Sequence, residues 1–288
     1  VDHFIGFDQL LRCLIGREKT IGLWGPPGLI NAVQNKIAAY DWNLVTNYDG
    51  NLQLHVFELD LDRRLTSARF CGVDGFAREE LSTRSCDGGV LISDPSFEVS
   101  ASFVDHGYPI LAFSLQERAR INIWRSRVEG MGLAVGEWLN DFKQAILSGK
   151  DDSEAIPVSW ADNDQTRPPT LPLGHLKSRI MRVTKGRKIA YVVDITYSQA
   201  NVDRIVALAR DADIIFMESP FLEVDADQAA TRNHLTARQA GHLACLANAK
   251  QLRTFHYSPR YRGRETDLVQ EAQTAFLEGN AIALAAQT

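Results

Sequence analysis

The stretch Lys188-Ile-Ala-Tyr-Val-Val-Asp194 joins an apolar strand to an acidic residue, and the chain repeats this arrangement twice. Asp213-Ile-Ile-Phe-Met-Glu218 also ends in a carboxylate, and Leu252-Arg-Thr-Phe-His256 ends in a histidine. Apolar residues at helical spacing follow these strands, so the order is strand, helix, strand, helix. Parallel strands end at one edge of a sheet, where open α/β sheets bind ligands. We therefore expect the three terminal polar side chains to meet at one site.

Composition excludes several classes of protein. The 288 residues are 45% hydrophobic and 23% charged, which suits one large domain or two, and no apolar run is long enough to cross a bilayer. A net charge of −5 argues against nucleic-acid binding through bulk positive charge, although 31 Lys and Arg residues can still form a local basic patch. The four cysteines lack a Cys-x-x-Cys motif and indicate free thiols in a reducing compartment, the cytoplasm.

The first half of the chain predicts a helix at 6–15, a strand at 20–24 and a helix at 29–40. The turn Gly25-Pro-Pro-Gly28 ends that strand, because proline fixes φ and glycine adopts conformations closed to other residues. Alternation of apolar and polar residues from 52 to 102 predicts mostly antiparallel strands.

The middle of the chain has a different composition. Residues 114–149 are charged and helix-prone, and residues 151–174 are rich in Pro, Asp and Ser. We predict a lid or excursion at about 115–174 within a single domain spanning 1–288. Four arginines near the start of this excursion either contact phosphates or form a solvated helix face. They are Arg118, Arg120, Arg125 and Arg127.

The polar residues at strand ends suit a divalent metal hydrolase. Imidazole and carboxylate are ligands that zinc accepts, and one carboxylate can bridge two cations. Asp194 is the candidate bridge, although an aspartate after a strand can also cap a helix. His256 is a candidate ligand or an ordinary strand-end histidine. Asp2-His3 adds a further carboxylate and imidazole.

Two more histidines stand where they can serve this site. His106 follows a short β run and precedes a turn, which presents a ligand at a sheet edge. His234 precedes a helix and can donate a proton to a leaving oxygen if a carboxylate such as Glu218 orients it. Its alternative role is helix capping, which Thr236 fills equally well.

Together these segments resemble the ribonuclease Z branch of the metallo-β-lactamase superfamily. The resemblance covers nearly the whole chain, and the closing His-aromatic-Ser-x-Arg-Tyr is its most specific part. The matching segments, in the family's order, are Asp2-His3, Gly25–Gly28, His106-Gly-Tyr108, Lys188–Asp194, Ala212–Glu218, His234–Ala240 and His256–Tyr261.

The resemblance implies an αββα sandwich of two mixed sheets that holds two divalent metal ions, most commonly zinc, with manganese as the alternative. The family's opening motif is His-x-His-x-Asp-His, and only Asp2 and His3 of it stand here. We therefore expect a native segment before Val1 that supplies two histidines and the early strands of the first sheet.

The resemblance also assigns roles to single residues. It places around one metal Asp2, His3, Asp194 and His256. The second metal shares Asp194 and gains His106. The catalytic residues it implies are Asp2, which orients or deprotonates the nucleophile, and Glu218 and His234, which serve the leaving group. The substrate phosphate would contact Ser258 and Arg260.

The implied activity is that of a metal-dependent phosphodiesterase, an endoribonuclease of the transfer RNA 3′-processing type, in which a metal-activated hydroxide attacks phosphorus. The implied partners are RNA or a small phosphodiester, no membrane, and a second copy in a homodimer. Three departures from the family stand out: Met217-Glu-Ser-Pro220 replaces His-Glu-Ala-Thr, Val193-Asp-Ile195 replaces Gly-Asp-Thr, and no Gly- and Lys-rich transfer RNA arm is recognisable. The alternatives are hydrolysis of a small ester, thioester or lactam, and a degenerate member that binds without cutting.

Overall fold

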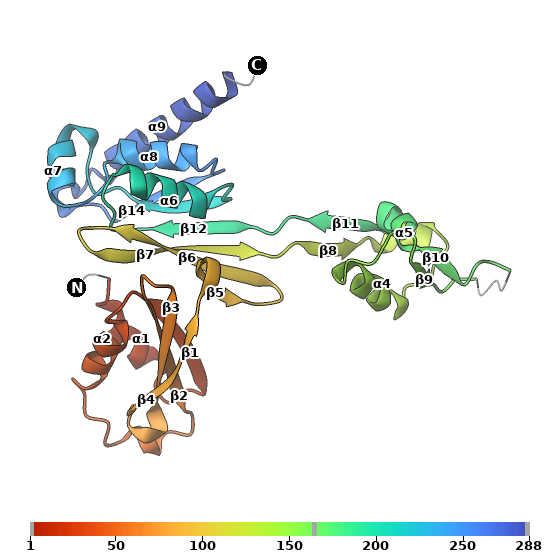
Figure 1. Cartoon of the computed structure of the whole chain (residues 1–288), viewed down its shortest axis with the longest axis horizontal. Helices are drawn as coiled ribbons and strands as arrows, with labels where there is room; N and C mark the ends of the chain where they lie inside the picture. Colours follow the sequence, from red (N-terminus) through yellow and green to blue (C-terminus); the bar gives the residue numbers. More distant parts are fainter. Residues whose placement is uncertain (1–2, 163–165, 286–288) are drawn as a thin grey trace. The chain divides into compact units, whose positions relative to one another are not determined.

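The computed structural model describes residues 3–162 and 166–285, which form two compact units (Figure 1). One unit combines the chain up to residue 116 with the chain from residue 188 onward. The other is the intervening segment, 117–187. The inserted unit extends beyond the excursion predicted at 115–174, because its last strand returns beside its first.

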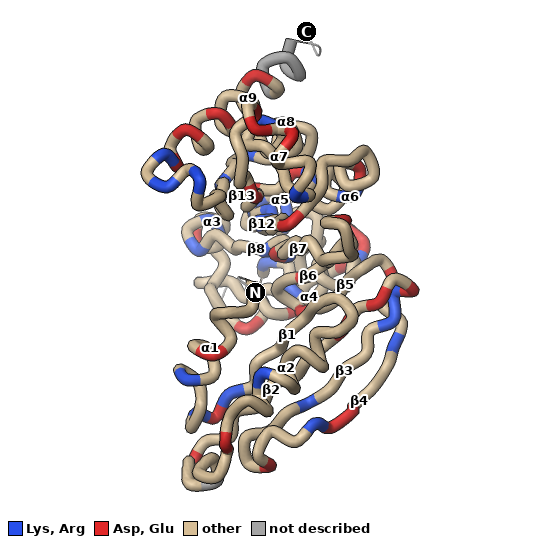
Figure 2. Tube along the Cα trace, turned by 90° about the vertical axis from the view of Figure 1, so that its left-hand side faces the viewer, with Lys and Arg blue, Asp and Glu red and all other residues tan. Residues whose placement is uncertain are grey.

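The first unit contains two mixed sheets. The four-stranded sheet has the order β1-β2-β3-β4, with β1 (Lys19–Gly25), β2 (Leu52–Leu59), β3 (Arg64–Cys71) and β4 (Arg78–Ser85). β1 runs parallel to β2, and the other neighbours are antiparallel. The edge strand β4 is exposed along its length and carries charges of both signs (Figure 2). Such charges oppose pairing with a further strand.

The second sheet has six strands in the order β14-β13-β12-β7-β6-β5. They are β5 (Val90–Ser93), β6 (Phe97–Asp105), β7 (Pro109–Glu117), β12 (Lys188–Val192), β13 (Ile214–Glu218) and β14 (Leu252–Phe255). β12, β13 and β14 are parallel, as predicted, and β7 is antiparallel to β12. β6 and β7 are joined by a tight turn, so β6 runs in the same direction as β12.

Helices cover the outer faces of both sheets. On the four-stranded sheet, α1 (Gly6–Leu14) and α2 (Leu29–Ile37) bury Phe7, Leu11 and Val33 against β2 and β3. The helices that follow β12 to β14 are α6 (Gln199–Ala209), α7 (Ala226–Thr231), α8 (Ala237–Leu246) and α9 (Glu265–Ala285). Of these, α6, α8 and α9 pack on the six-stranded sheet (Figure 1).

A separate apolar cluster lies between the inner faces of the two sheets. It joins Leu59 and Leu65 of the first sheet to Leu91, Ala101 and Leu111 of the second. The layer order is therefore helix, sheet, sheet, helix, and the predicted αββα sandwich of two mixed sheets is confirmed. The predicted antiparallel pairing between residues 52 and 102 is also confirmed.

The inserted unit has its own core. A two-stranded ladder pairs β8 (Arg120–Ile123) with β11 (Met181–Thr184), and a second pairs β9 (Ala155–Pro157) with β10 (Thr170–Pro172). Three helices, α3 (Arg125–Gly130), α4 (Trp138–Leu147) and α5 (Leu173–Ile180), surround a cluster that includes Phe142 and Leu176. No helix in the described parts of the chain is long and apolar enough to cross a membrane.

Candidate functional site

The carboxyl ends of β12, β13 and β14 lie at one edge of the six-stranded sheet. Glu218 is the last residue of β13, His256 follows β14 directly, and Asp194 stands just beyond β12. Because β6 runs in the same direction, its end presents His106 at this edge too. The convergence expected from the strand pattern is therefore present.

Three residues at this edge have left-handed backbone conformations. The φ angles are 52° at Asp194, 59° at Asn233 and 60° at His256. A residue with a side chain adopts this region at a cost of about 1–3 kcal/mol, and such strain gathers at functional sites. Asp194 does not cap the following helix, because Ser198 does so.

Four side chains bring possible ligand atoms within 4.8 Å of one another, and they are Asp194, Glu218, His234 and His256. His3 joins them through Nε2, which lies 2.8 Å from Oδ2 of Asp194. The other carboxylate oxygen of Asp194, Oδ1, is buried and has no hydrogen-bond partner among the described residues. A buried oxygen without a partner is costly, and a cation would satisfy it. The donor set therefore fits a divalent metal.

Glu218 is the one fully buried member of this four-residue cluster. Its carboxylate accepts hydrogen bonds from the backbone N–H groups of Asp194, Ile195 and Leu235, at 2.9, 3.2 and 3.1 Å. It also lies 3.0 Å from Nδ1 of His234 and 3.2 Å from Nδ1 of His256.

The ionisation of Glu218 follows from these contacts. Burial alone would raise its pKa, but the hydrogen bonds from His234, His256 and the Leu235 N–H outweigh burial and lower the pKa to about 2. Glu218 is therefore an anion at neutral pH. When Nδ1 of each histidine donates to it, Nε2 of each ring is left to face the site.

His106 lies beside this cluster. Its ring centroid is 4.7 Å from that of His234, and its Nδ1 is 2.8 Å from the carbonyl oxygen of Asn233. A carbonyl only accepts, so the proton sits on Nδ1 and Nε2 is available as a metal ligand. His234 does not cap α8, because Thr236 does so through a capping box with Gln239.

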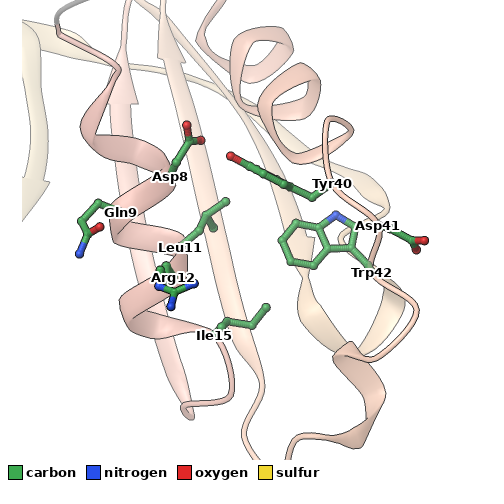
Figure 3. A pocket seen from close by; sticks show the side chains of 8 residues that line it. All are labelled: Asp8, Gln9, Leu11, Arg12, Ile15, Tyr40, Asp41 and Trp42. Carbon is green, nitrogen blue, oxygen red and sulfur yellow. The ribbon is translucent and has the colours of Figure 1, made fainter.

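A cavity of about 460 Å³ opens onto the cluster. Its wall includes the predicted site residues His3, His106, Asp194, His234 and His256. A second cavity, of about 400 Å³, lies between α1 and the segment that follows α2 (Figure 3). Asp8, Arg12, Tyr40 and Trp42 line that second cavity, and Asp8 pairs with Lys36 at 2.8 Å. It contains none of the predicted ligands.

The two residues predicted to bind the substrate phosphate, Ser258 and Arg260, have partners within the protein. Ser258 caps the 3₁₀ turn Pro259–Tyr261 through a 3.4 Å contact with the N–H of Arg260. The Arg260 guanidinium forms an ion pair with Asp225 at 2.9 Å. Their contact with a substrate phosphate stays a prediction. Asp2 lies outside the described residues.

Two residues at the site were not found by sequence reasoning, Asn201 and Asn233. Asn201 is buried in α6, and Asn233 holds His106 through its backbone. An asparagine in a helix or loop is ordinarily a surface residue, so its residue type alone does not predict a role at this site. Only the position of Asn233 beside a predicted catalytic histidine could have drawn attention to it.

Comparisons with known proteins agree with the motifs. No protein-family model matches the chain. Ribonuclease Z of Deinococcus radiodurans is 28% identical over 278 residues, covering 96% of this chain and 78% of that protein. Ribonuclease Z of Nostoc punctiforme is 27% identical, covering 96% and 71%. Among solved structures, human tRNase Z, short form, is 17% identical with a TM-score of 0.47, covering 91% of this chain and 70% of that one. The chain is a homologue of the proteins named ribonuclease Z, as its motifs predicted.

Proposed function

We propose that this protein is a metal-dependent phosphodiesterase that cuts RNA, as its homologues' name implies. The observation that carries the proposal is a cluster of four possible ligands in which one oxygen, Oδ1 of Asp194, is buried without a hydrogen-bond partner. The cluster consists of Asp194, Glu218, His234 and His256. A cluster of this kind, in a cavity and beside histidines from separate segments, is typical of a hydrolytic metal site.

The residues that would hold metal fall into two groups. One cation would be held by His3, Asp194 and His256, with Asp2 as a further predicted ligand. The other would share Asp194 and gain His106. Zinc suits these nitrogen and oxygen ligands, and manganese is the alternative. Bound divalent ions lower the pKa of water and neutralise charge on phosphoryl oxygens.

His234 is proposed to donate the proton to the leaving oxygen. Its Nδ1 is held by Glu218 at 3.0 Å, so the ring cannot turn and Nε2 is directed into the site. In its protonated form the imidazole keeps its Nδ1–H on Glu218 and can give its Nε2 proton to the leaving oxygen as the P–O bond breaks. His234 is only partly exposed, with 17% of its side chain accessible, which limits competition from bulk water.

The inserted unit is proposed to contact the RNA backbone. Residues 117–187 contain twelve Lys and Arg residues and nine Asp and Glu residues, whereas the whole chain carries −5. Arg127 stacks over Trp124 at 3.5 Å, which forms a flat cationic surface. Two of the four arginines noted in the sequence are engaged in ion pairs, Arg120 with Glu117 and Arg125 with Glu129. Arg127 also donates to the carbonyl of Arg179 at 3.4 Å, and the stacking of its guanidinium on Trp124 makes it our candidate for a phosphate or base contact.

We expect Arg127→Ala to raise KM for a structured RNA about tenfold, because a cation or base stacking contact contributes roughly 1–3 kcal/mol. Turnover of bis(p-nitrophenyl) phosphate should be unchanged, since this small diester needs only the metal site. Lys150→Ala is the matched control, because it removes one positive charge from the same unit at a residue paired with Glu154. Equal losses on both substrates in Arg127→Ala would refute the assignment.

The activity itself is tested with purified protein supplied with zinc or manganese. Hydrolysis of RNA and of bis(p-nitrophenyl) phosphate, without turnover of a thioester or β-lactam, supports the proposal. Thioester or lactam turnover alone would favour the small-ester alternative. Absence of bound metal together with absence of activity would favour a degenerate binding protein.

Two finer features belong to the proposal. The four cysteines are all free thiols, which supports a reducing compartment such as the cytoplasm. A homodimer is proposed from the resemblance alone, and sedimentation of the purified protein tests it.

A further inference from the structure

His106 stands on a three-residue turn that is held by two asparagines from distant parts of the chain. The turn joins β6 to β7, and the His106 N–H donates to the carbonyl of Tyr108 at 3.1 Å. Asn201, from α6, contacts Asp105 at the start of the turn. Asn233, from the loop before His234, contacts the ring of His106. Neither asparagine belongs to the set of metal or catalytic residues proposed above.

Asn201 joins the end of β6 to the loop that carries Asp194. Only 1% of its surface is exposed. Its Oδ1 accepts from the N–H of Asp105 at 2.9 Å, and its Nδ2 donates to the carbonyls of Asp105 at 2.9 Å and Thr196 at 2.8 Å. The Thr196 N–H donates in turn to the Asp105 carbonyl at 2.9 Å.

These bonds require a side chain that both accepts and donates. Asp105 precedes His106, and Thr196 follows Asp194 by two residues. The amide of Asn201 therefore sets the spacing between the backbones of two predicted metal ligands. Both the oxygen and the nitrogen of the Asn201 amide have partners, which lets this buried contact hold the two backbones at a fixed spacing.

Asn233 fixes the ring of His106. Its left-handed backbone directs its carbonyl oxygen to Nδ1 of His106, at 2.8 Å. The side chain of Asn233 also packs closely against Gly107, the residue after His106. Gly107 has a φ of +82°, and a Cβ built there would lie 2.8 Å from Nδ2 of Asn233. The histidine, the glycine and the asparagine thus form one packed unit.

We propose that Asn201 and Asn233 are positioning residues for His106: Asn201 places its backbone and Asn233 sets its ring orientation and tautomer. The inference rests on the proposed metal site and deepens it. Ligating histidines characteristically bond through their second nitrogen to a carbonyl or carboxylate, and loss of that partner weakens metal affinity about 10- to 100-fold. His106 receives this support from backbone placed by the asparagines.

The ring assignment is tested with Asn233→Val, Asn233→Gly and Asn248→Val. Valine disfavours a left-handed backbone and so displaces the carbonyl, whereas glycine accepts it. Asn248 is the matched control, because it has a φ of 52° and is exposed in the loop leading to the amino end of β14, away from the site.

The first readout is the imidazole ¹⁵N spectrum of metal-free protein at a pH where His106 is neutral. We expect Asn233→Val to lose the Nδ1–H tautomer of His106 and to bind one zinc ion about 10- to 100-fold more weakly. Asn233→Gly should retain both properties. Asn248→Val should lower Tm as Asn233→Val does and leave the His106 signals and both zinc affinities unchanged.

Asn201→Asp tests the backbone assignment. The variant keeps the shape and the acceptor of Asn201 but turns an oxygen toward two carbonyls, so we expect His106 signals to shift while His256 signals stay in place. Unchanged His106 signals in both Asn201→Asp and Asn233→Val would overturn the proposal. The tautomer is read without metal or substrate, so a protein that hydrolyses nothing can still confirm the positioning roles.

Discussion

Asp194→Ala is expected to abolish hydrolysis of bis(p-nitrophenyl) phosphate while leaving the fold intact. Asp194 is the proposed bridging ligand, so its loss removes an anchor from both cations. Divalent metals contribute several kcal/mol to such reactions, which corresponds to a loss in kcat/KM of roughly a thousandfold or more. Zinc content should fall in parallel. The fold should persist because Oδ1 of Asp194 makes no hydrogen bond in the described structure, and Oδ2 pairs with His3, whose side chain is exposed.

The measurement compares kcat/KM, bound zinc and Tm for Asp194→Ala, His256→Ala and Asp203→Ala. Asp203 is an exposed aspartate on α6 and serves as the matched control, since it removes the same charge without touching the cluster. His256→Ala should resemble Asp194→Ala, because its ring nitrogen lies 3.5 Å from Oδ1 of Asp194. Turnover close to the wild-type rate in Asp194→Ala or His256→Ala would remove that residue from the mechanism.

The part of this site that the sequence predicts is the part built on parallel strands. Apolar runs ending in Asp194, Glu218 and His256 predict both the strands and their shared edge, because parallel strands align their carboxyl ends. The position of His106 at this edge is also predictable from the sequence, because a histidine that follows a strand and precedes a turn lies at the end of that strand. These predictions depend on local pattern and on one general rule of sheet geometry.

The remaining features depend on contacts between segments far apart in the chain. Nothing near Arg260 in the sequence shows that it pairs with Asp225, because the geometry of the 3₁₀ turn Pro259–Tyr261 and a residue 35 positions away decide this. Asn201 meets Asp105 across 96 residues, for the same reason. The inserted unit ends at 187 because β11 pairs with β8, and strand pairing leaves little trace in the composition of either strand.

Glu218→Gln is expected to lower both activity and stability. Glu218 accepts bonds from three backbone N–H groups and from two histidines, and a glutamine offers one acceptor oxygen and an NH₂ group that would face donors. Hydrogen bonds to a buried charged group contribute about 1.5–3 kcal/mol, and a donor left unsatisfied costs more. We expect the free energy of unfolding of the metal-free protein to fall by about 3 kcal/mol at pH 7.

The pKa of Glu218 predicts how that difference changes with pH. The folded value, about 2, lies below the ordinary 4.5, so ionisation of Glu218 stabilises the fold above pH 4.5 and this contribution is lost as the pH falls toward 2. The shift corresponds to roughly 3 kcal/mol, in line with the estimate from hydrogen bonding. Glutamine does not titrate. The difference in unfolding free energy between wild type and Glu218→Gln should therefore be full at pH 7 and shrink steadily between pH 4.5 and 2.

Urea unfolding at a series of pH values measures this difference directly, and subtracting the variant from the wild type cancels the titration of groups that do not contact residue 218. Glu79→Gln is the control, because Glu79 is half exposed and paired with Arg69 on the surface. An exposed pair contributes about 0–1 kcal/mol, so its variant should differ little from wild type at any pH. A gap for Glu218→Gln that stays constant from pH 7 to pH 2.5 would mean that the pKa of Glu218 is the same in the folded and unfolded protein, so that its contacts with His234 and His256 do not stabilise the anion. In that case it could not hold His234 as a proton donor, and the proposed path for the leaving-group proton would have to be abandoned.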